Sequence, residues 1–471
     1  MFMSVLVEEI QPSSANARRT YNYNILTNGV AMQICNFFSS NQLDIGAGIE
    51  AKKWSKYYVD NGLNVYECVG EDYLGLPTFG AKDLFVFPEG KMDNPVNQRL
   101  TVSGINENFN LNQVFEEVYL AAKKLAPKLE RLYEKYKIQI IHVSGYFSYP
   151  ISLSLTQCLV QLINDKNIKS VSMNHDFLWE RQYKLRGPIR EIYEHFLPVI
   201  NSNNLTVVST QYAAEMFKKR YPNINVVVIP SLFDFRNDLS LTHSKKKIFR
   251  NSIGVQERDI LIIQPSRISP PKGIHLSINL AYNIKKHTGK RVVLLVTGSR
   301  SVGFSTNYHK QLIKFADEIG VEVIWTKFPY AKCNGLVCDH NNCMATAYMS
   351  SDIVSMPSSV EGFGNPVIES VVFKKPLVTT EYPVMKYEFL AKGFRFHMIP
   401  VDEEITKYMY QKENYAFSIH SYSKDFLDAL LDDTLSINGN SMHVKNFELA
   451  NKYYCSEKID EYLKPVLNWI N

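Results

Sequence analysis

Residues 357–369 read Pro-Ser-Ser-Val-Glu-Gly-Phe-Gly-Asn-Pro-Val-Ile-Glu, and this stretch predicts both the local fold and the chemistry around it. A short apolar run, Ile353 to Met356, precedes it and has the length of a buried strand. A second apolar run, Val367 to Phe373, follows it and predicts a short helix. The segment is therefore expected to be a strand-to-helix turn, with Asn365 as the N-cap and Pro366 in the first helical turn.

This turn combines features that suit an anion with features that do not. Gly362 and Gly364 let a ligand approach the backbone closely, and the free N–H groups of a helix start favour anions. Glu361 and Glu369 would repel a bare phosphate, but carboxylates accept hydrogen bonds from hydroxyl groups. A nucleotide sugar, which carries hydroxyls and a diphosphate, satisfies both requirements. The alternative is an ordinary strand-loop-helix connection with surface glutamates.

The spacing of the two glutamates within Pro-Ser-x-x-Glu-Gly-Phe-Gly resembles the donor-site motif of retaining glycosyltransferases of the GT-B fold, the family-four type, also called glycosyl transferases group 1. The resemblance covers most of the chain at fold level, and its motifs lie in the second half. It implies an α/β fold with two Rossmann-like domains facing a central cleft. It also implies a set of residues that bind the nucleotide sugar, with the first glutamate at the transferred sugar and the last at the ribose: Glu361, Gly362, Phe363, Gly364, Asn365 and Glu369.

A second cluster, at residues 260–273, reads Ile-Leu-Ile-Ile-Gln-Pro-Ser-Arg-Ile-Ser-Pro-Pro-Lys-Gly. Its apolar start predicts a buried parallel strand, followed by a loop that carries Arg267 and Lys272. In the resembled family an arginine and a lysine at this strand end hold the diphosphate. Fixed cations there stabilise the charge that builds on the leaving diphosphate when the sugar–phosphate bond breaks. The alternative is a pair of solvated surface charges.

Length and composition point to a two-domain chain in a reducing compartment. The 471 residues exceed what one core comfortably holds, which predicts two domains of roughly 200 residues each. A net charge of +5 is small for this length and does not indicate a nucleic-acid binder. No window approaches the ~20 apolar residues of a membrane span. Seven dispersed cysteines do not suggest a disulfide framework, so a cytoplasmic location is expected.

Apolar runs of strand length alternate with helical segments along the whole chain, which is the pattern of parallel sheets built from βαβ units. The first strand is hard to place, and Tyr23 to Val30 is the best candidate. The other strands are expected at residues 63–69, 138–143, 170–173, 205–208, 226–229, 260–264, 291–297, 321–325, 353–356 and 377–380. Helices are expected at residues 49–61, 114–136, 213–220, 367–373, 424–431, 444–454 and 459–469.

The predicted domain organisation has four parts. Residues 1–235 form an N-terminal, acceptor-side Rossmann-like domain, and residues 259–445 form a C-terminal domain that binds the nucleotide sugar. Residues 236–258 are polar and basic, with Lys245-Lys246-Lys247 among them, and are expected to be a linker. The resemblance implies that the C-terminal helix, within residues 446–471, returns to the N-terminal domain.

Two further features fall in the first half. Gly46-Ala47-Gly48 is expected to be a glycine-rich turn entering a helix, and the resemblance places Gly46 and Gly48 against the phosphates; a simple tight turn is the alternative. His175-Asp176 follows a strand, so its side chains would lie at the carboxyl end of a parallel sheet. The resemblance implies that His175 contacts the transferred sugar; a structural hydrogen-bonding histidine is the alternative. It further implies front-face attack, in which the leaving phosphate takes the acceptor proton.

Four basic residues within ten positions follow this histidine: Arg181, Lys184, Arg186 and Arg190. They predict either a solvated face or an acceptor that carries a phosphate or carboxylate.

A metal site is not predicted. Cys333, Cys338 and Cys343 surround His340, but their spacing is not the two-residue knuckle of common zinc sites. No Asp-x-Asp occurs in the chain, whereas metal-dependent glycosyltransferases of the other major fold use such a pair. Arg267 and Lys272 are expected to neutralise the diphosphate without a metal, and no cofactor is expected apart from the nucleotide sugar itself.

Together these features predict a metal-independent, retaining transfer of a hexose, with glucose or mannose favoured, from a nucleoside diphosphate sugar to an unidentified acceptor. The catalytic candidates are His175, Glu361, Arg267 and Lys272. An epimerase or phosphorylase acting on a related sugar is an alternative, and so is an inactive subunit that binds a sugar nucleotide.

Overall fold

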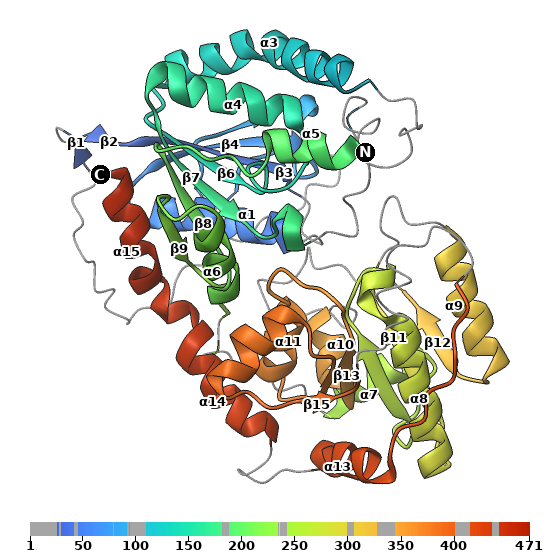
Figure 1. Ribbon diagram of the computed structural model, residues 1–471. Coiled ribbons are helices and arrows are strands. Elements are labelled where there is room, and N and C mark those ends of the chain that lie inside the picture. Colours follow the sequence, from blue (N-terminus) through green and yellow to red (C-terminus); the bar gives the residue numbers. More distant parts are fainter. Residues whose placement is uncertain are drawn as a thin grey trace, which may run out of the picture.

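Two α/β domains, one above the other in Figure 1, make up the computed structural model. Each contains one parallel sheet with helices on both faces, so the predicted fold class is confirmed. The structure describes residues 26–27, 30–41, 46–78, 80–91, 94, 110–180, 188–233, 235, 243–298, 306–326, 344–400, 415–435 and 442–471.

The N-terminal domain is built on a seven-stranded parallel sheet in the order β5-β4-β3-β6-β7-β8-β9. Both of its faces are buried, because neighbouring residues such as Ile34 and Cys35 enter different cores. Such two-sided burial produces the continuous apolar runs seen in the sequence. The strands are β3 (Gln33–Ser40), β4 (Asn64–Glu71), β5 (Asp83–Val86), β6 (Ile140–Ser144), β7 (Lys169–Asn174), β8 (Asn204–Val208) and β9 (Val226–Val228).

Helices cover this sheet in two groups (Figure 1). Those on one face are α3 (Leu111–Tyr136), α4 (Leu153–Lys166) and α5 (Pro188–Phe196). Those on the other are α1 (Gly46–Asp60) and the C-terminal α15 (Ile459–Ile470), while α6 (Gln211–Arg220) packs beside β8.

The C-terminal domain has a six-stranded parallel sheet in the order β12-β11-β10-β13-β14-β15. Its two central strands, β10 (Ile260–Gln264) and β13 (Ile353–Met356), have the predicted bounds and lie next to each other. The loops that follow these two strands therefore meet at one edge of the sheet. The remaining strands are β11 (Val292–Val296), β12 (Glu322–Trp325), β14 (Leu377–Thr379) and β15 (His397–Met398).

Helices again cover both faces of this second sheet. One face packs against α8 (Ile274–Thr288), α9 (Thr306–Glu318) and α13 (Lys424–Leu435). The other packs against α7 (His243–Ser252), α10 (Met344–Ser350), α11 (Asn365–Val372) and α14 (Met442–Tyr454). No helix in the described part of the chain is both long and apolar enough to cross a membrane.

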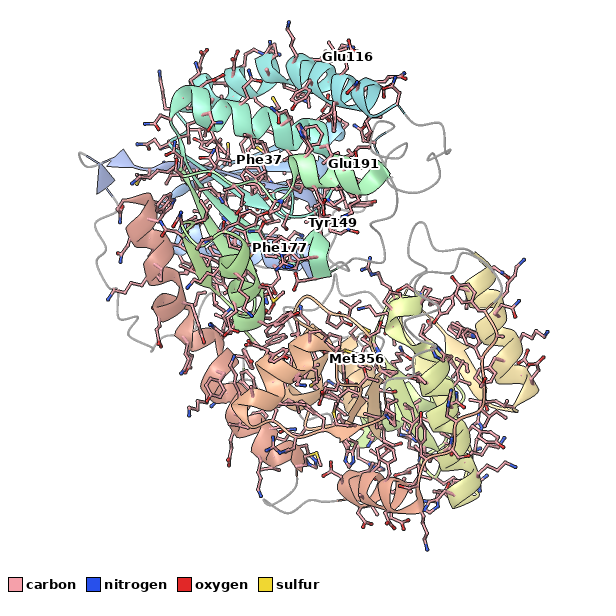
Figure 2. The ribbon with its side chains drawn as sticks, viewed as in Figure 1. Phe37, Glu116, Tyr149, Phe177, Glu191 and Met356 are labelled. Carbon is pink, nitrogen blue, oxygen red and sulfur yellow. The ribbon has the colours of Figure 1, made fainter. Side chains whose placement is uncertain are left out.

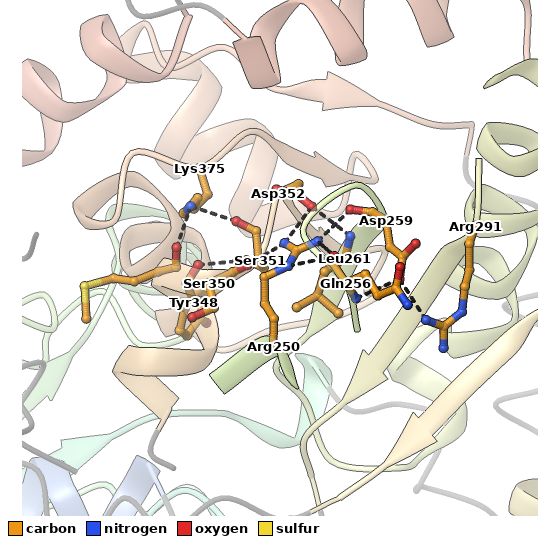
Figure 3. Close-up of polar contacts among 11 residues, drawn as sticks. Arg250, Gln256, Asp259, Leu261, Arg291, Tyr348, Ser350, Ser351, Asp352 and Lys375 are labelled. Carbon is orange, nitrogen blue, oxygen red and sulfur yellow. Dashed lines mark hydrogen bonds and ion pairs between the residues drawn. The ribbon is translucent and has the colours of Figure 1, made fainter. Parts of the chain in front are cut away.

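The predicted linker, residues 236–258, is wrong from residue 243 onward, because α7 belongs to the C-terminal domain; residues 236–242 lie outside the described residues. Phe249 is fully buried in the domain core. Arg250 is 3% exposed and donates to the carbonyl of Ser350 at 3.0 Å and to the Asp352 carboxylate at 3.1 Å (Figure 3). The lysine run that suggested a linker lies on the same helix, one turn before these buried residues.

The first strand was also misplaced. Residues 23–30 were expected to form it, but the described residues of this stretch belong to a short antiparallel ribbon of β1 (Leu26–Thr27) and β2 (Val30–Ala31). The first strand of the sheet is β3. Asn36 in β3 is fully buried and donates to the carbonyl of Ala51 and to Ser55 Oγ, so a polar residue interrupts the apolar run without breaking the strand.

The chain crosses between the domains at two adjacent places. On the outward path Phe233 enters the C-terminal core, and on the return path Tyr454 is the last residue of that core. The two paths are hydrogen-bonded to each other: Phe233 N donates to Tyr454 O at 2.9 Å, and Ser456 N donates to Phe233 O at 2.7 Å. The return thus begins after Tyr454, later than residue 446, and α15 then packs on the N-terminal sheet.

Candidate functional site

The turn at residues 357–369 joins β13 to α11, as the sequence predicts, but its cap is one residue earlier. Gly364, not Asn365, occupies the N-cap position, with φ of 94°. A side chain would be strained in that conformation, and its Cβ would lie 3.0 Å from the Tyr382 hydroxyl. Glycine is therefore required at the position where the helix begins.

Lys272 and Glu361 form an ion pair across the edge of the C-terminal sheet. Lys272 Nζ lies 2.5 Å from Glu361 Oε1, and the two side chains are only 15% and 10% exposed. The solvated-charge alternative is therefore wrong for Lys272. The pair still leaves both groups further hydrogen-bonding capacity, because an ammonium has three donors and a carboxylate about four acceptor sites.

A main-chain hydrogen bond joins the two loops that carry this ion pair: Ser359 N donates to the Pro271 carbonyl at 2.9 Å. Within the first loop, Gln264 Nε2 donates to the Lys272 carbonyl at 2.7 Å. The two loops follow the adjacent strands β10 and β13, which explains why two motifs about ninety residues apart in the sequence meet. Arg267, in the same loop, has an exposed side chain with no ion pair to any described residue.

The Glu361-Gly362 loop also touches the N-terminal domain. A Cβ on Gly362 would lie 2.3 Å from the His175 carbonyl oxygen and 2.6 Å from Asp176 Oδ1, so a larger residue does not fit there. Ser209 Oγ, before α6, donates to the Gly362 carbonyl at 3.5 Å. The structure thus brings the predicted residues Glu361, Gly362 and His175 together where the two domains meet. Figure 2 shows Phe177, two residues after His175, on the side of the N-terminal domain that faces the C-terminal domain.

His175 has an unsatisfied side-chain nitrogen in this region. Its Nε2 is buried and has no hydrogen-bond partner among the described residues. Burial lowers its pKa, and the charges of Glu50 and Asp176 oppose that shift. A neutral imidazole with a free Nε2 can accept or donate one hydrogen bond to a sugar hydroxyl.

Glu369 lies inside the first turns of α11 and is 7% exposed. Burial raises its pKa, whereas a hydrogen bond from the Tyr348 hydroxyl, at 2.5 Å, and the charge of Lys53 lower it. Burial thus disfavours the ionised form of this carboxylate, and the two neighbours favour it. Tyr348 comes from α10 and Lys53 from α1 of the other domain, and no sequence motif links either to Glu369.

The remaining predicted binding residues differ in how they can act. The Phe363 ring packs in the core against Phe389 and Tyr454, so only its backbone can face a ligand. Asn365 is half-buried in the first turn of α11. Gly46 and Gly48 belong to the first turn of α1 and do not form a separate turn before it.

Most of the predicted acceptor and cysteine residues cannot be placed. Arg181, Lys184, Arg186 and the Cys333/Cys338/Cys343 segment lie outside the described residues. Arg190, on α5, has an exposed side chain paired with Glu194 at 2.9 Å, which fits a solvated helix face. Within the described ranges, no group of three or more histidine, cysteine, aspartate or glutamate side chains is arranged to hold a metal.

Comparison with known proteins agrees with the fold and the type of enzyme expected from the sequence. The family model for glycosyl transferases group 1 matches residues 245–409. The chain is 25% identical over 447 residues to mannosylglucosylglycerate synthase of Thermotoga maritima, covering 89% of this chain and 95% of that enzyme. It is 24% identical over 391 residues to the enzyme of the same name from Petrotoga mobilis, covering 78% of this chain and 86% of the other.

Two solved structures share the whole architecture. Sucrose-phosphate synthase of Thermosynechococcus elongatus has a TM-score of 0.62 at 12% identity and covers 93% of this chain and 98% of its own. Anabaena HepE, solved with UDP and glucose, has a TM-score of 0.59 at 15% identity. The match covers 93% of this chain and 99% of HepE. The family match covers β10, β13 and α11, the elements that carry both predicted motifs. These matches support a glycosyltransferase of group 1 type, with the GT-B fold.

Proposed function

We propose that this enzyme transfers a hexose from a nucleoside diphosphate sugar to a hydroxyl acceptor with retention of configuration and without a metal ion. The observation that carries the proposal is the largely shielded Lys272–Glu361 ion pair beside the start of α11, with Gly362 of the same loop against His175 of the other domain. A cation, a helix N-terminus and a carboxylate within one small region match a diphosphate linked to a hydroxyl-bearing ring.

In this proposal each group has a separate task. Lys272, the exposed Arg267 and the N–H groups of α11 stabilise the negative charge that develops on the leaving diphosphate. Glu361 and the free Nε2 of His175 hydrogen-bond hydroxyls of the transferred ring from opposite domains, while Glu369 accepts hydrogen bonds from the ribose. The attacking hydroxyl approaches the face that the diphosphate leaves, and its proton passes to a phosphate oxygen.

The relatives narrow the proposed substrates. Both mannosylglucosylglycerate synthases are named for a product that contains mannose, glucose and glycerate. We infer that mannose is the favoured hexose here, with glucose as the second choice. Glycerate carries a carboxylate, which agrees with the anionic acceptor suggested by the basic residues after His175.

The test is a product assay. The purified enzyme is incubated with mannose and glucose donors of guanosine, uridine and adenosine diphosphate, each with and without glucosylglycerate, and products are identified by nuclear magnetic resonance. A new α-glycoside that forms from an α-linked donor only when the acceptor is present supports the proposal. An inverted β-glycoside, or an isomerised donor without acceptor, would overturn it.

A further inference from the structure

Glu388 is a fully buried carboxylate where the two domains meet, and none of the sequence motifs includes it. It belongs to a single π-helical turn, Met385–Phe389, which follows β14 in the C-terminal domain, and it is 0% exposed. Its Oε1 pairs with the ammonium of Lys392. The Tyr454 hydroxyl donates to the same oxygen at 3.0 Å. Two donors of the C-terminal domain thus hold one oxygen of this side chain in place.

The second oxygen of Glu388 reaches the N-terminal domain. Glu388 Oε2 accepts a hydrogen bond at 3.0 Å from the backbone N–H of Gln211, the first residue of α6. An N–H at this position has no partner within its own helix, and a carboxylate suits the positive end of a helix. The Thr210 side chain caps a different donor, Ala213 N, at 3.1 Å. Glu388 therefore caps α6 from the other domain.

Neighbouring contacts follow the same boundary. In Figure 1, α6 lies on the side of the N-terminal domain that faces the C-terminal domain. Tyr212 and Tyr387 stack with ring centres 5.3 Å apart and ring planes 4° from parallel. On the other side of Gln211, Ser209 Oγ donates to the Gly362 carbonyl at 3.5 Å. The start of α6 is thus docked on the C-terminal domain by contacts on both sides of the Glu388 hydrogen bond.

The start of α6 is next to the strand end that carries His175. Asn174, the last residue of β7, pairs with Val208, the last residue of the adjacent parallel strand β8. The next residues, His175 and Ser209, therefore leave the sheet at the same edge. His175 in turn lies against Gly362, since a Cβ on that glycine would be 2.3 Å from the His175 carbonyl oxygen. A shift of α6 relative to the C-terminal domain would therefore also move His175 relative to the Gly362 loop.

We infer that Glu388 is a positioning residue for the proposed sugar transfer: by capping α6 across the domain boundary, it sets where His175 meets the loop of Glu361. The inference rests on the proposed function, in which His175 and Glu361 contact one transferred ring from opposite domains. In this role Glu388 acts through the placement of α6 and does not contact the sugar. A misplacement of about 1 Å between the two halves of a site can cost on the order of a hundredfold in rate.

The experiment removes the hydrogen bond from its donor side. Gln211→Pro deletes the N–H that Glu388 accepts, and proline is favoured at the first position of a helix. Thr210 already has the extended backbone that a residue before proline adopts, with φ of −138° and ψ of 151°. Gln211→Ala keeps the N–H and is the matched control, because the Gln211 side chain is exposed. Glu388→Leu removes the acceptor, and a variant with both changes completes a double-mutant cycle.

Four measurements are made on the intact wild type and each variant. They are kcat with the mannose and glucose donors and glucosylglycerate of the product assay, calorimetric titration of GDP and UDP, melting temperature, and hydrogen–deuterium exchange of residues 174–180 and 212–217. Gln211→Pro should lower kcat roughly ten- to hundredfold and leave the melting temperature and the Kd of the tighter nucleotide unchanged. The nucleotide is unaffected because Lys272 and Glu369, its proposed contacts, belong to the C-terminal domain. Exchange should become faster in both segments.

The control and the cycle show whether the effect belongs to this hydrogen bond. Gln211→Ala should match wild type in every measurement. Glu388→Leu should also lower the melting temperature, because Lys392 and Tyr454 lose their acceptor. The double variant should lose no more kcat than Glu388→Leu does, since both changes remove the same hydrogen bond. If Glu388→Leu does not fold, Gln211→Pro and Gln211→Ala still provide the test.

Four outcomes would overturn the inference: normal kcat in Gln211→Pro, an equal loss in Gln211→Ala, single losses that multiply in the double variant, and unchanged exchange in both segments. A purely structural role of Glu388 would lower the melting temperature and leave kcat of the folded enzyme unchanged. The proposed function fails separately. A wild type that forms no glycoside overturns that function, and the exchange data then still decide whether Glu388 docks α6.

Discussion

Lys272 Nζ and Glu361 Oε1 lie 2.5 Å apart although 89 residues separate them in the chain, and both side chains are largely shielded from water. Breaking a buried ion pair from one side leaves an uncompensated charge, which costs more than removing both partners. The pair therefore links the folding of the C-terminal domain to the chemistry proposed at its edge.

The first prediction concerns this coupling. Lys272→Met and Glu361→Gln should each reduce the free energy of unfolding by about 3–5 kcal/mol, whereas the double variant should cost less than the sum of the two. Chemical denaturation followed by circular dichroism measures all three. Additive losses would show that the two charges do not stabilise each other. Turnover should fall in every variant.

The second prediction separates chemistry from stability at Arg267. Because its side chain is exposed and makes no ion pair with the described residues, Arg267→Ala should leave the melting temperature unchanged while kcat falls at least tenfold. Arg258→Ala, an exposed arginine in the turn before β10, is the control and should retain normal kcat. Equal kcat for both variants would remove Arg267 from the proposed mechanism.

The third prediction distinguishes the two glutamates. Contacts to the transferred ring strengthen as it distorts toward the transition state, whereas ribose contacts are made about equally before and during reaction. Glu361→Gln should mainly lower kcat, and Glu369→Gln should mainly raise KM and weaken nucleoside diphosphate binding by about 1–3 kcal/mol. Steady-state kinetics and titration of the free nucleotide test this division, which is wrong if both variants weaken nucleotide binding equally.

The fourth prediction concerns metal ions. If Arg267, Lys272 and the start of α11 neutralise the diphosphate, dialysis against a strong chelator should leave at least half of the activity. The measurement is the rate of glycoside formation before and after dialysis. Loss of activity that Mg²⁺ or Mn²⁺ restores, but Na⁺ at equal ionic strength does not, would contradict the proposed mechanism.

The fifth prediction tests the network around Arg250 (Figure 3). Its guanidinium donates to the carbonyl of Asp259 at 2.6 Å as well as to Ser350 and Asp352, so Arg250→Met leaves several buried acceptors unsatisfied. The free energy of unfolding should fall by about 3–5 kcal/mol. Lys247→Met, on the exposed side of the same helix, should change it by less than about 0.5 kcal/mol. If Arg250→Met and Lys247→Met reduced the free energy of unfolding equally, the Arg250 network would contribute little to stability.

Continuous apolar runs made much of the fold predictable. β10 and β13 have the predicted bounds because a strand buried on both faces needs apolar residues at every position. β3 was missed because Asn36 and Ser40 interrupt its run; the Asn36 side-chain amide is accommodated by donating to Ala51 O and Ser55 Oγ of α1. α7 was mistaken for a linker because its three consecutive lysines indicated an exposed segment, and only Phe249 and Arg250 of this helix are buried.

The motifs predicted the C-terminal part of the site, whereas its partners could not be read from the sequence. Glu361 and Lys272 follow adjacent parallel strands, so their proximity follows from the topology. The Tyr348 hydroxyl bonds Glu369 from a different helix, and the charge of Lys53 acts on it from a different domain. Such contacts depend on how elements pack and leave no regular spacing in the chain.

The pairing of Phe233 with the Tyr454–Ser456 segment has a mechanical consequence. Both covalent connections between the domains pass through one point, so relative motion of the domains is limited mainly to rotation about that point. Two separated connections would hold the rotation to the line that joins them, whereas a single point leaves its direction to the surfaces where the domains touch. The approach of Gly362 to His175 is one such surface.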